Sequence, residues 1–225
     1  MLTQEIKGIL GASKKRGWVL EPGAKRLLGL AGLAVPKFKW STSLDELLNF
    51  AQEIGYPVVA KVVSPKVLHK TDSGGVVVGI EDEAGLKEAF EKLSSQEGFD
   101  GVLVEEMLAG VELIIGAKVD YQFGPVILMG LGGTGVEIYR DTTLRMAPLT
   151  RNDVESMIRG LKAHELLEGY RGSEPVSLEE LTRMLLAFSG LVMEIEEQFE
   201  SIDLNPVMCS SDGCVVADAR IMLKG

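Results

Sequence analysis

Residues that could bind phosphate lie at several separated places in this 225-residue chain. Gly130-Leu-Gly132-Gly133-Thr-Gly135 matches the G-x-G-x-x-G pattern of dinucleotide-binding loops and follows an apolar stretch typical of a strand. Such a loop requires a helix to begin among its glycines, because the helix N-terminus holds the pyrophosphate. Residues 136–145 are instead rich in β-branched and aromatic side chains without helical spacing. The pattern disfavours a Rossmann domain and leaves two alternatives, a phosphate cradle of backbone amides or a plain turn between strands.

A lysine within an apolar run is the second feature. Lys61 lies in Tyr56-Pro-Val-Val-Ala-Lys-Val-Val, which predicts a buried strand. A buried ammonium needs an anion, either a carboxylate or a nucleotide phosphate. The loop that follows carries His69, one of two histidines in the chain, and the glycine turn Ser73-Gly74-Gly75. A loop histidine taken alone is more often a surface residue than a catalytic one.

Oxygen ligands for a divalent ion occur near the C-terminus. Asp203 and Asn205 are two residues apart in a predicted strand, so their side chains share a face. Asp218 lies on the strand predicted to pair with it. Carboxylate and amide oxygens suit Mg²⁺, which takes few protein ligands and otherwise binds water and phosphate oxygens. A polar sheet face without a metal is the alternative.

Composition excludes some classes of protein. The net charge of −10 argues against a nucleic-acid-binding protein, which should present a basic surface. Cys209 and Cys214 flank a predicted hairpin turn, which favours two strand-end thiols in a reducing cytosol over a zinc pair. No segment reaches the ~18 uncharged apolar residues of a membrane span. We therefore expect a cytoplasmic protein without a membrane or nucleic-acid partner.

Apolar spacing predicts the elements that position these groups. Three residue pairs have the capping-box spacing that marks helix starts: Ser43 and Glu46, Thr150 and Asp153, Ser177 and Glu180. Helices are expected at residues 21–31, 45–54, 82–93, after 150 and 178–198. Strands are expected at residues 56–63, 75–80, 101–107, 111–119, 125–130, 136–140, 201–208 and 214–222. This mixture predicts an α+β fold, with a domain boundary near residue 103.

Six segments, in order, resemble those of one family: KVVSPKVLHKTDSGGV, FGPVILMGLGGTGVE, LRMAPL, LLEGYRG, SIDLNPV and VADARI. From about Glu21 to Ile221 the chain is similar to the ATP-grasp β subunit of the ADP-forming acyl-CoA synthetases (acetate–CoA ligase, ADP-forming), relatives of succinyl-CoA synthetase. The resemblance implies an ATP-grasp fold, in which two α/β lobes, here residues 1–103 and 104–225, grip a nucleotide. The glycine loop belongs to this pattern as a phosphate loop, not a Rossmann one.

The resemblance also implies a reaction, acyl-CoA + ADP + phosphate ⇌ acid + ATP + CoA. In the family the phosphoryl group passes through histidines, one on a separate α subunit that binds CoA and one on the β subunit. The β-subunit motif corresponds to Leu68-His69-Lys70 here. His69 is therefore implied as the phosphoryl-carrying nucleophile, a role suited to imidazole because its neutral nitrogen is available near neutral pH.

Contacts to ATP or ADP follow from the same resemblance. Lys61 is implied to contact the nucleotide phosphates, with the turn Ser73, Gly74 and Gly75 folding over them. Glu105, Glu106 and Met107 resemble the hinge that reads adenine through its backbone. Glu112 stands where the family places an acid towards the ribose, and Gly132 and Gly133 belong to the phosphate loop.

The resemblance assigns Asn205 and Asp218 to Mg²⁺. Asp203 either assists the metal or orients the phosphohistidine, and Arg145 in LRMAPL is a candidate clamp on the transferring phosphate. Cations are expected in such a site because phosphoryl transfer depends mainly on positioning and charge neutralisation.

Departures from the family pattern limit these expectations. Tyr121 follows Asp120 where the family has proline, and Thr134-Gly135 replaces bulkier loop residues. The chain lacks a CoA-binding Rossmann domain and a ligase domain, so an α subunit in an α₂β₂-type assembly is expected. Two other classes stay open: a nucleotide-binding regulatory module of a protein acyltransferase-like system, and an ATP-grasp carboxylate–amine ligase that needs no histidine carrier.

Overall fold

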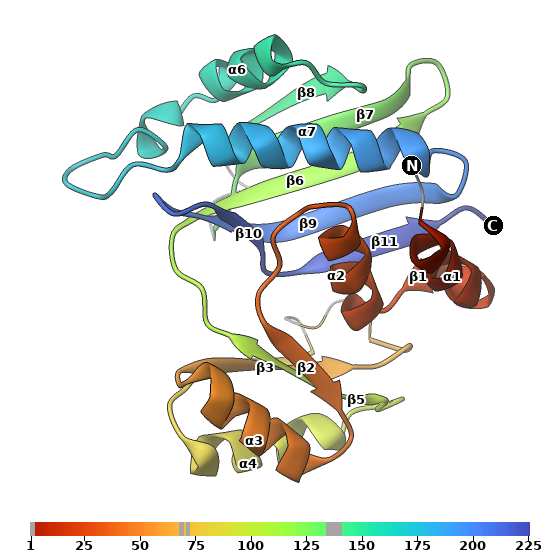
Figure 1. Ribbon diagram of the computed structural model, residues 1–225, viewed down its shortest axis with the longest axis vertical. Helices are drawn as coiled ribbons and strands as arrows, with labels where there is room; N and C mark the ends of the chain where they lie inside the picture. Colours follow the sequence, from red (N-terminus) through yellow and green to blue (C-terminus); the bar gives the residue numbers. More distant parts are fainter. Residues whose placement is uncertain (1–2, 68–69, 71–72, 134–140) are drawn as a thin grey trace. The chain divides into compact units, whose positions relative to one another are not determined.

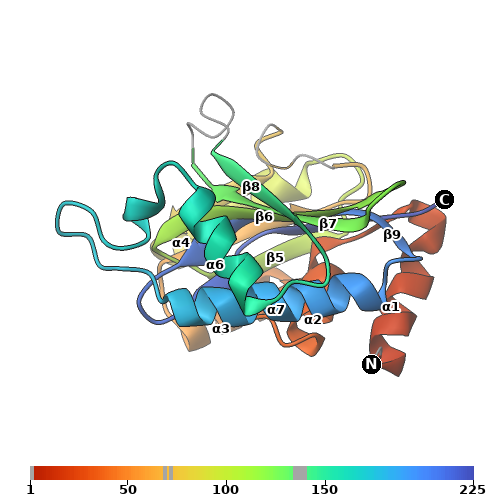
Figure 2. The same cartoon turned by 90° about the horizontal axis from the view of Figure 1, so that it is seen from above.

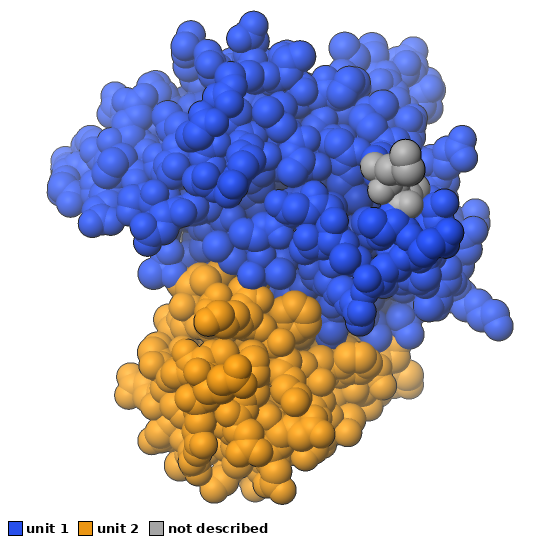
Figure 3. All heavy atoms as spheres, in the orientation of Figure 1, with its two compact units in different colours: residues 1–35, 109–225 blue, residues 36–108 orange. Residues whose placement is uncertain are grey.

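Two compact units make up the computed structural model, which describes residues 3–67, 70, 73–133 and 141–225 (Figures 1 and 3). The small unit contains residues 36–108. The large unit contains residues 1–35 and 109–225. The chain therefore passes between the units twice, at residues 35–36 and 108–109.

The boundary expected near residue 103 differs from this division. Residue 103 lies inside β5 (Gly101–Glu106), which pairs along its whole length with β3 (Val58–Val63). The first 35 residues join the large unit because β1 (Trp18–Val19) pairs with β11 (Ala219–Leu223). Pairing between the two ends of a chain leaves no local sequence signal, so a residue-by-residue pattern does not reveal it.

An antiparallel sheet forms the small unit, in the strand order β2-β5-β3-β4, where β2 is Phe38–Ser41 and β4 is Val76–Ile80. Helices α3 (Leu44–Ile54) and α4 (Glu83–Ser94) pack on one face of it (Figure 1). Both helices begin at side-chain caps, since Ser43 accepts from the Glu46 amide and Asp82 from the Gly85 amide.

A second antiparallel sheet forms the large unit, in the order β1-β11-β9-β6-β7-β8 with β10 also paired to β9. Its remaining strands are β6 (Val111–Asp120), β7 (Gly124–Leu131), β8 (Thr142–Met146), β9 (Phe199–Cys209) and β10 (Cys214–Val216). Helices α1 (Gln4–Ser13), α2 (Glu21–Leu30), α6 (Arg151–Gly160) and α7 (Leu178–Glu194) lie on one face (Figure 2). Short 3-10 turns occupy Lys14–Arg16 and His164–Leu166.

Alternation along β6 separates the two faces of the large sheet. Leu113, Ile115 and Ala117 are buried in the core beneath the helices. Ile114 and Lys118 point to the opposite face, which we call the open face of the large unit. Asp203, one of the candidate ligands near the C-terminus, lies on this open face, where solvent and ligands can reach it.

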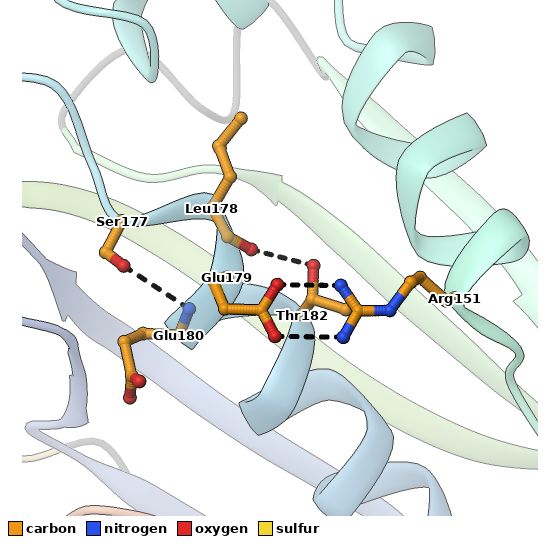
Figure 4. A network of polar contacts seen from close by, with 6 residues as sticks. All are labelled: Arg151, Ser177, Leu178, Glu179, Glu180 and Thr182. Atoms are coloured by element: carbon orange, nitrogen blue, oxygen red, sulfur yellow. Dashed lines mark hydrogen bonds and ion pairs between the residues drawn. The ribbon is translucent and has the colours of Figure 1, made fainter.

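The start of α7 shows how local polar contacts begin a helix (Figure 4). Ser177 Oγ accepts from the Glu180 amide at 3.4 Å, as the sequence predicted, and Thr182 donates to the carbonyl four residues earlier at 2.7 Å. Arg151 of α6 forms a bidentate ion pair with Glu179, with N–O distances of 2.7 and 2.9 Å.

No helix in the described ranges, α7 included, is both long enough and apolar enough to span a membrane.

Most predicted elements are confirmed, with boundaries shifted by a few residues. Helix α7 ends at Glu194 instead of residue 198. The sequence patterns did not predict α1, β1, β2 or β8, and the strand expected at residues 136–140 lies outside the described residues. The missed strands have two to five residues each, which is too short for an alternating pattern to stand out.

Candidate functional site

A buried ion pair joins Lys61 to Glu105 in the small unit. Their Nζ and Oε1 atoms are 2.8 Å apart, and the two residues are 5% and 2% exposed. Lys61 of β3 lies opposite Leu103 of β5, so Glu105 is its diagonal neighbour on the same sheet face. The predicted burial of Lys61 is confirmed, and a carboxylate supplies an anion for it. The Glu105 side chain thus has a role that the hinge resemblance did not include.

The turn before β4 is built on the carbonyl of Lys70. This oxygen accepts from the Gly75 amide at 2.7 Å and from Ser73 Oγ at 3.0 Å. Gly74 has φ +66°, and a Cβ on Gly75 would approach a Val62 methyl group to 2.8 Å. The backbone conformation therefore favours glycine at position 74, and the close approach to Val62 favours it at position 75. His69, the predicted nucleophile, lies outside the described residues.

The end of β5 carries the predicted hinge residues. Two hydrogen bonds join Glu106 to Lys37. The Glu106 amide donates to the Lys37 carbonyl at 3.2 Å, and the Glu106 carboxylate accepts from the Lys37 amide at 3.1 Å. Met107 is 48% exposed and lies just before the crossing at residues 108–109. The two ends of the small unit are therefore tied together at its boundary.

The glycine loop of the large unit packs directly on Glu112. The Gly132 amide donates to the Glu112 carbonyl at 2.6 Å, and a Cβ on Gly132 would lie 2.8 Å from the Glu112 Cβ. Gly133 has φ +94°, a conformation that favours glycine. The structure thus brings Glu112, Gly132 and Gly133 together, three residues for which the sequence implied nucleotide contacts. Thr134 and Gly135 lie outside the described residues.

A β-bulge places the predicted metal ligands side by side. Leu113 pairs with Val207 and Ile115 pairs with Leu204. The pairing therefore advances three residues along β9 while it advances two residues along β6. The extra residue falls at Asn205-Pro206, and bulges of this kind redirect a side chain next to many active sites. The signal was present in the sequence, because a proline inside a central strand marks a bulge.

The bulge brings Asn205 beside Asp218. The Asn205 amide donates to the Asp218 carbonyl at 3.2 Å, and the Asp218 carboxylate accepts from the Ala219 amide at 2.8 Å. Asn205 is exposed and Asp218 is half-buried. The described part of the chain contains no cluster of three or more His, Cys, Asp or Glu side chains suited to a metal. One amide and one carboxylate oxygen therefore fit Mg²⁺, which completes its shell with water and phosphate, better than zinc.

Asp203 has a partner that the motifs did not indicate. Its carboxylate lies 3.0 Å from the guanidinium of Arg220, the residue directly opposite on β11. Asp203 also lines a pocket of about 490 Å³ on the open face, whose walls are mainly apolar and include Ile114, Leu128 and Leu144. The charge of Asp203 is thus balanced in part by a neighbouring cation. Pairing the two predicted C-terminal strands in register would have identified Arg220.

The Arg145 side chain forms its hydrogen bonds away from Asp203, Asn205 and Asp218. Its guanidinium donates to Ser156 Oγ of α6 and to the Leu144 carbonyl. Leu144, one residue earlier on β8, lines the pocket of the open face. Because neighbouring strand residues point to opposite faces, the Arg145 side chain is directed to the helix-covered face. The geometry therefore separates the expected phosphate clamp from Asp203 and Asn205.

The two cysteines lie directly opposite each other on β9 and β10, and both are buried free thiols. A hydrogen bond with Cys214, followed by burial, raises the pKa of the Cys209 thiol far above its usual value. Metal binding requires the thiolate form. The expected position of both thiols at the ends of two paired strands is therefore confirmed.

Comparison with known proteins gives one consistent family. The ATP-grasp domain family matches residues 11–223. The β subunit of acetate–CoA ligase (ADP-forming) II from Pyrococcus furiosus is 43% identical over 218 residues, covering 92% of each chain. The dinucleotide-forming acetyl-coenzyme A synthetase 1 of Ca. Korarchaeum cryptofilum, solved with coenzyme A, Ca-AMPCP and HgCl⁺, superposes with a TM-score of 0.91 at 41% identity, covering 97% of this chain and 99% of that one.

A further structure of that synthetase contains coenzyme A and Mg-AMPPCP, with a phosphohistidine segment that points towards the nucleotide-binding site. It matches with a TM-score of 0.86 at 41% identity, covering 97% of this chain and 100% of that one. The predicted ATP-grasp fold is confirmed by these matches. The chain belongs to the ATP-grasp family, as a β subunit of the ADP-forming acyl-CoA synthetases.

Proposed function

We propose that this β subunit carries the phosphoryl group between the nucleotide and its partner subunit on His69. A neutral imidazole nitrogen of His69 attacks the γ-phosphorus of ATP, a phosphorus–nitrogen bond forms, and ADP leaves with the bridging oxygen. In reverse, the phosphohistidine transfers its phosphoryl group to ADP. The partner subunit completes the overall reaction, acyl-CoA + ADP + phosphate ⇌ acid + ATP + CoA.

The observation that carries this proposal is the bulge that sets Asn205 beside Asp218. Their oxygens would hold Mg²⁺, which neutralises charge on the phosphate oxygens when it is bound. The Mg-AMPPCP complex of the related synthetase supports the assignment of a Mg–nucleotide to this family. Asp203, paired with Arg220, would then orient the phosphohistidine instead of binding the metal, because its carboxylate already has a cationic partner.

The proposal assigns candidate nucleotide contacts within each unit separately. Lys61 and the turn of Ser73, Gly74 and Gly75 would bind the phosphates, and the backbone of Glu105, Glu106 and Met107 would read the base. Glu112 would bind the ribose, next to the amides of Gly132 and Gly133. The close approach of Gly132 to Glu112 supports placing ribose and phosphate contacts next to each other. Arg145 has no part in the proposal, because its side chain is bonded to Ser156.

The β-subunit family implies a partner subunit. We propose that this partner carries the CoA-binding and ligase domains and assembles with the chain as α₂β₂. The acyl specificity would then belong mainly to the partner. The cytoplasmic location expected from the sequence stays part of the same proposal.

Labelling with γ-labelled ATP and Mg²⁺ tests the carrier, with and without a candidate α subunit. We expect an acid-labile, base-stable label on this chain that disappears in His69→Asn. His164→Asn is the matched control, because His164 is the other histidine and its Nδ1 lies 3.0 Å from the Leu161 carbonyl. An unlabelled chain that still binds ATP would favour the regulatory-module alternative. A label that persists in His69→Asn would place the carrier elsewhere.

A further inference from the structure

A buried ion pair in the large unit has no part in the function described so far. Lys25 and Glu21 of α2 are 0% and 2% exposed, and their Nζ and Oε1 atoms are 3.5 Å apart. Burying an ammonium and a carboxylate costs free energy, which their mutual attraction often fails to recover. An apolar pair of similar volume would commonly be as stable, so stability alone does not account for Lys25.

The ammonium of Lys25 is hydrogen-bonded to the backbone next to the candidate metal site. Its Nζ donates to the Ala217 carbonyl at 2.7 Å. Ala217 lies in the bend between β10 and β11, immediately before Asp218. Lys25 is thus connected to the predicted metal carboxylate by one peptide unit.

Further bonds fasten this bend to the Asn205 bulge. The amides of Ala217 and Asp218 donate to the Pro206 carbonyl at 3.0 and 3.4 Å. The Asn205 amide donates in turn to the Asp218 carbonyl at 3.2 Å. The backbones that carry both candidate ligands therefore form one frame, which Lys25 anchors to α2.

We propose that Lys25 is a positioning residue for the metal site, and that Glu21 balances its charge. By holding the Ala217 carbonyl, Lys25 sets the direction in which the Asp218 carboxylate leaves the bend. Partners that orient a ligand in this way are typically important for metal affinity. This inference rests on the proposed function, because it requires Asp218 to be a metal ligand.

Metal binding to the full chain tests it directly, with Mn²⁺ as a paramagnetic probe titrated in the presence of ADP. We expect Lys25→Met to weaken Mn²⁺ binding by about tenfold or more. Glu21→Gln breaks the same ion pair but keeps the bond to Ala217, so it should lower Tm while leaving the Mn²⁺ affinity near that of the wild type. Arg26→Met is the matched control, because Arg26 is the next residue of α2, is exposed, and pairs with Glu5.

Asp218→Asn separates failure of this inference from failure of the metal site. If Asp218→Asn weakens Mn²⁺ binding and folded Lys25→Met does not, the positioning role is wrong and the metal site stands. If Asp218→Asn binds Mn²⁺ like the wild type, both are wrong. If Glu21→Gln and Lys25→Met weaken Mn²⁺ binding equally, the weaker binding results from loss of the ion pair. The proposed role of the hydrogen bond to Ala217 would then be wrong.

Lys25→Gln covers the case in which Lys25→Met does not fold. Its amide donor is neutral and one bond shorter than the lysine side chain, so it should not reach the Ala217 carbonyl. The same loss of Mn²⁺ affinity is expected for this variant, and wild-type affinity in folded Lys25→Gln would overturn the proposal.

Discussion

The ion pair of Lys61 and Glu105 allows structural and nucleotide-binding roles to be separated at the scale of single residues. Glu105 is only 2% exposed, and Lys61→Met removes the ammonium that pairs with its carboxylate. We expect it to lower the free energy of unfolding of the small unit by about 3–5 kcal/mol, the usual cost of removing one partner of a buried pair. Urea unfolding followed by circular dichroism measures this change.

The double variant Lys61→Met/Glu105→Leu supplies the control for that prediction. It removes both charges, so most of the lost stability should return. If Lys61 also contacts phosphates, the stable double variant should still bind ADP at least about tenfold more weakly, as expected for a lost charge-assisted bond. A double variant with wild-type ADP affinity would make Lys61 purely structural.

The contact between Gly132 and Glu112 gives a second prediction. Gly132→Ala places a methyl group 2.8 Å from the Glu112 Cβ and 2.9 Å from its carbonyl carbon, so the loop backbone must move. If the amides of Gly132 and Gly133 bind the phosphates as proposed, their displacement should weaken ADP binding. Isothermal titration with MgADP measures this effect.

Gly190→Ala is the matched control for Gly132→Ala. Gly190 lies in α7, and a Cβ there would meet no heavy atom within 4 Å. The change should leave ADP affinity unaltered and stabilise the helix by about 0.5–1 kcal/mol. Equal ADP affinity in the two alanine variants would remove the glycine loop from the proposed site.

Sequence reasoning at the residue scale succeeded where the reason was local and failed where it depended on pairing. The burial of Lys61 followed from its apolar neighbours and is confirmed, whereas the roles expected for Asp203 and Asn205 stay predictions. The Glu105 and Arg220 partners required strand register, which no single stretch of sequence contains. Arg145 shows the same limit, because the face of β8 that it occupies depends on where the strand begins.

At the scale of elements, the cap of α6 couples helix stability to pH. Thr150 Oγ1 accepts from the Asp153 amide, and the Asp153 carboxylate accepts from the Thr150 amide at 2.8 Å. Hydrogen bonds from the Thr150 side chain and then its backbone lower the pKa of Asp153. The stabilising contribution is therefore complete above the unfolded pKa of about 3.9 and is lost as pH falls through the lower folded value.

Thr150→Ala should accordingly lower Tm by about 2–4 °C at pH 7. The difference from the wild type should begin to narrow below about pH 4 and should vanish only below the lower folded pKa of Asp153, where the carboxyl is protonated in both states. Thr150→Ser keeps the hydroxyl and should stay close to the wild-type Tm throughout. A Tm difference between Thr150→Ala and the wild type that does not change with pH would show that the Asp153 half of the cap contributes nothing.

Elements were predictable from sequence in proportion to how local their signals are. The caps at Ser43, Thr150 and Ser177 lie within four residues of the amides they bind, and all three helices begin where the spacing predicted. β1 and β2 have two and four residues and depend on partners far along the chain. Their sequences alone carry too little pattern to identify them.

The whole molecule consists of two units, each with its own apolar core. Six motifs were enough to predict the ATP-grasp fold, because their order along the chain is specific even where each motif is weak. The division into units was not predictable in the same way, since it depends on β1 pairing with β11. The smaller core of residues 36–108 implies a lower local stability for the small unit.

Native-state hydrogen exchange should therefore show faster exchange for β3 and β5 than for β6 and β9 without nucleotide. If Lys61 and the turn at residues 73–75 bind phosphates, MgADP should slow exchange in the small unit, by about 2.7 kcal/mol at 100 times its Kd. The Val62 amide, bonded to the Gly75 carbonyl at 2.8 Å, is the most direct reporter. If Asn205 and Asp218 bind Mg²⁺ as proposed, removing the metal with EDTA should reduce the ADP-dependent part of this protection. Protection confined to the large unit would exclude the small unit from the nucleotide site, and the roles proposed for Lys61 and its turn would be wrong.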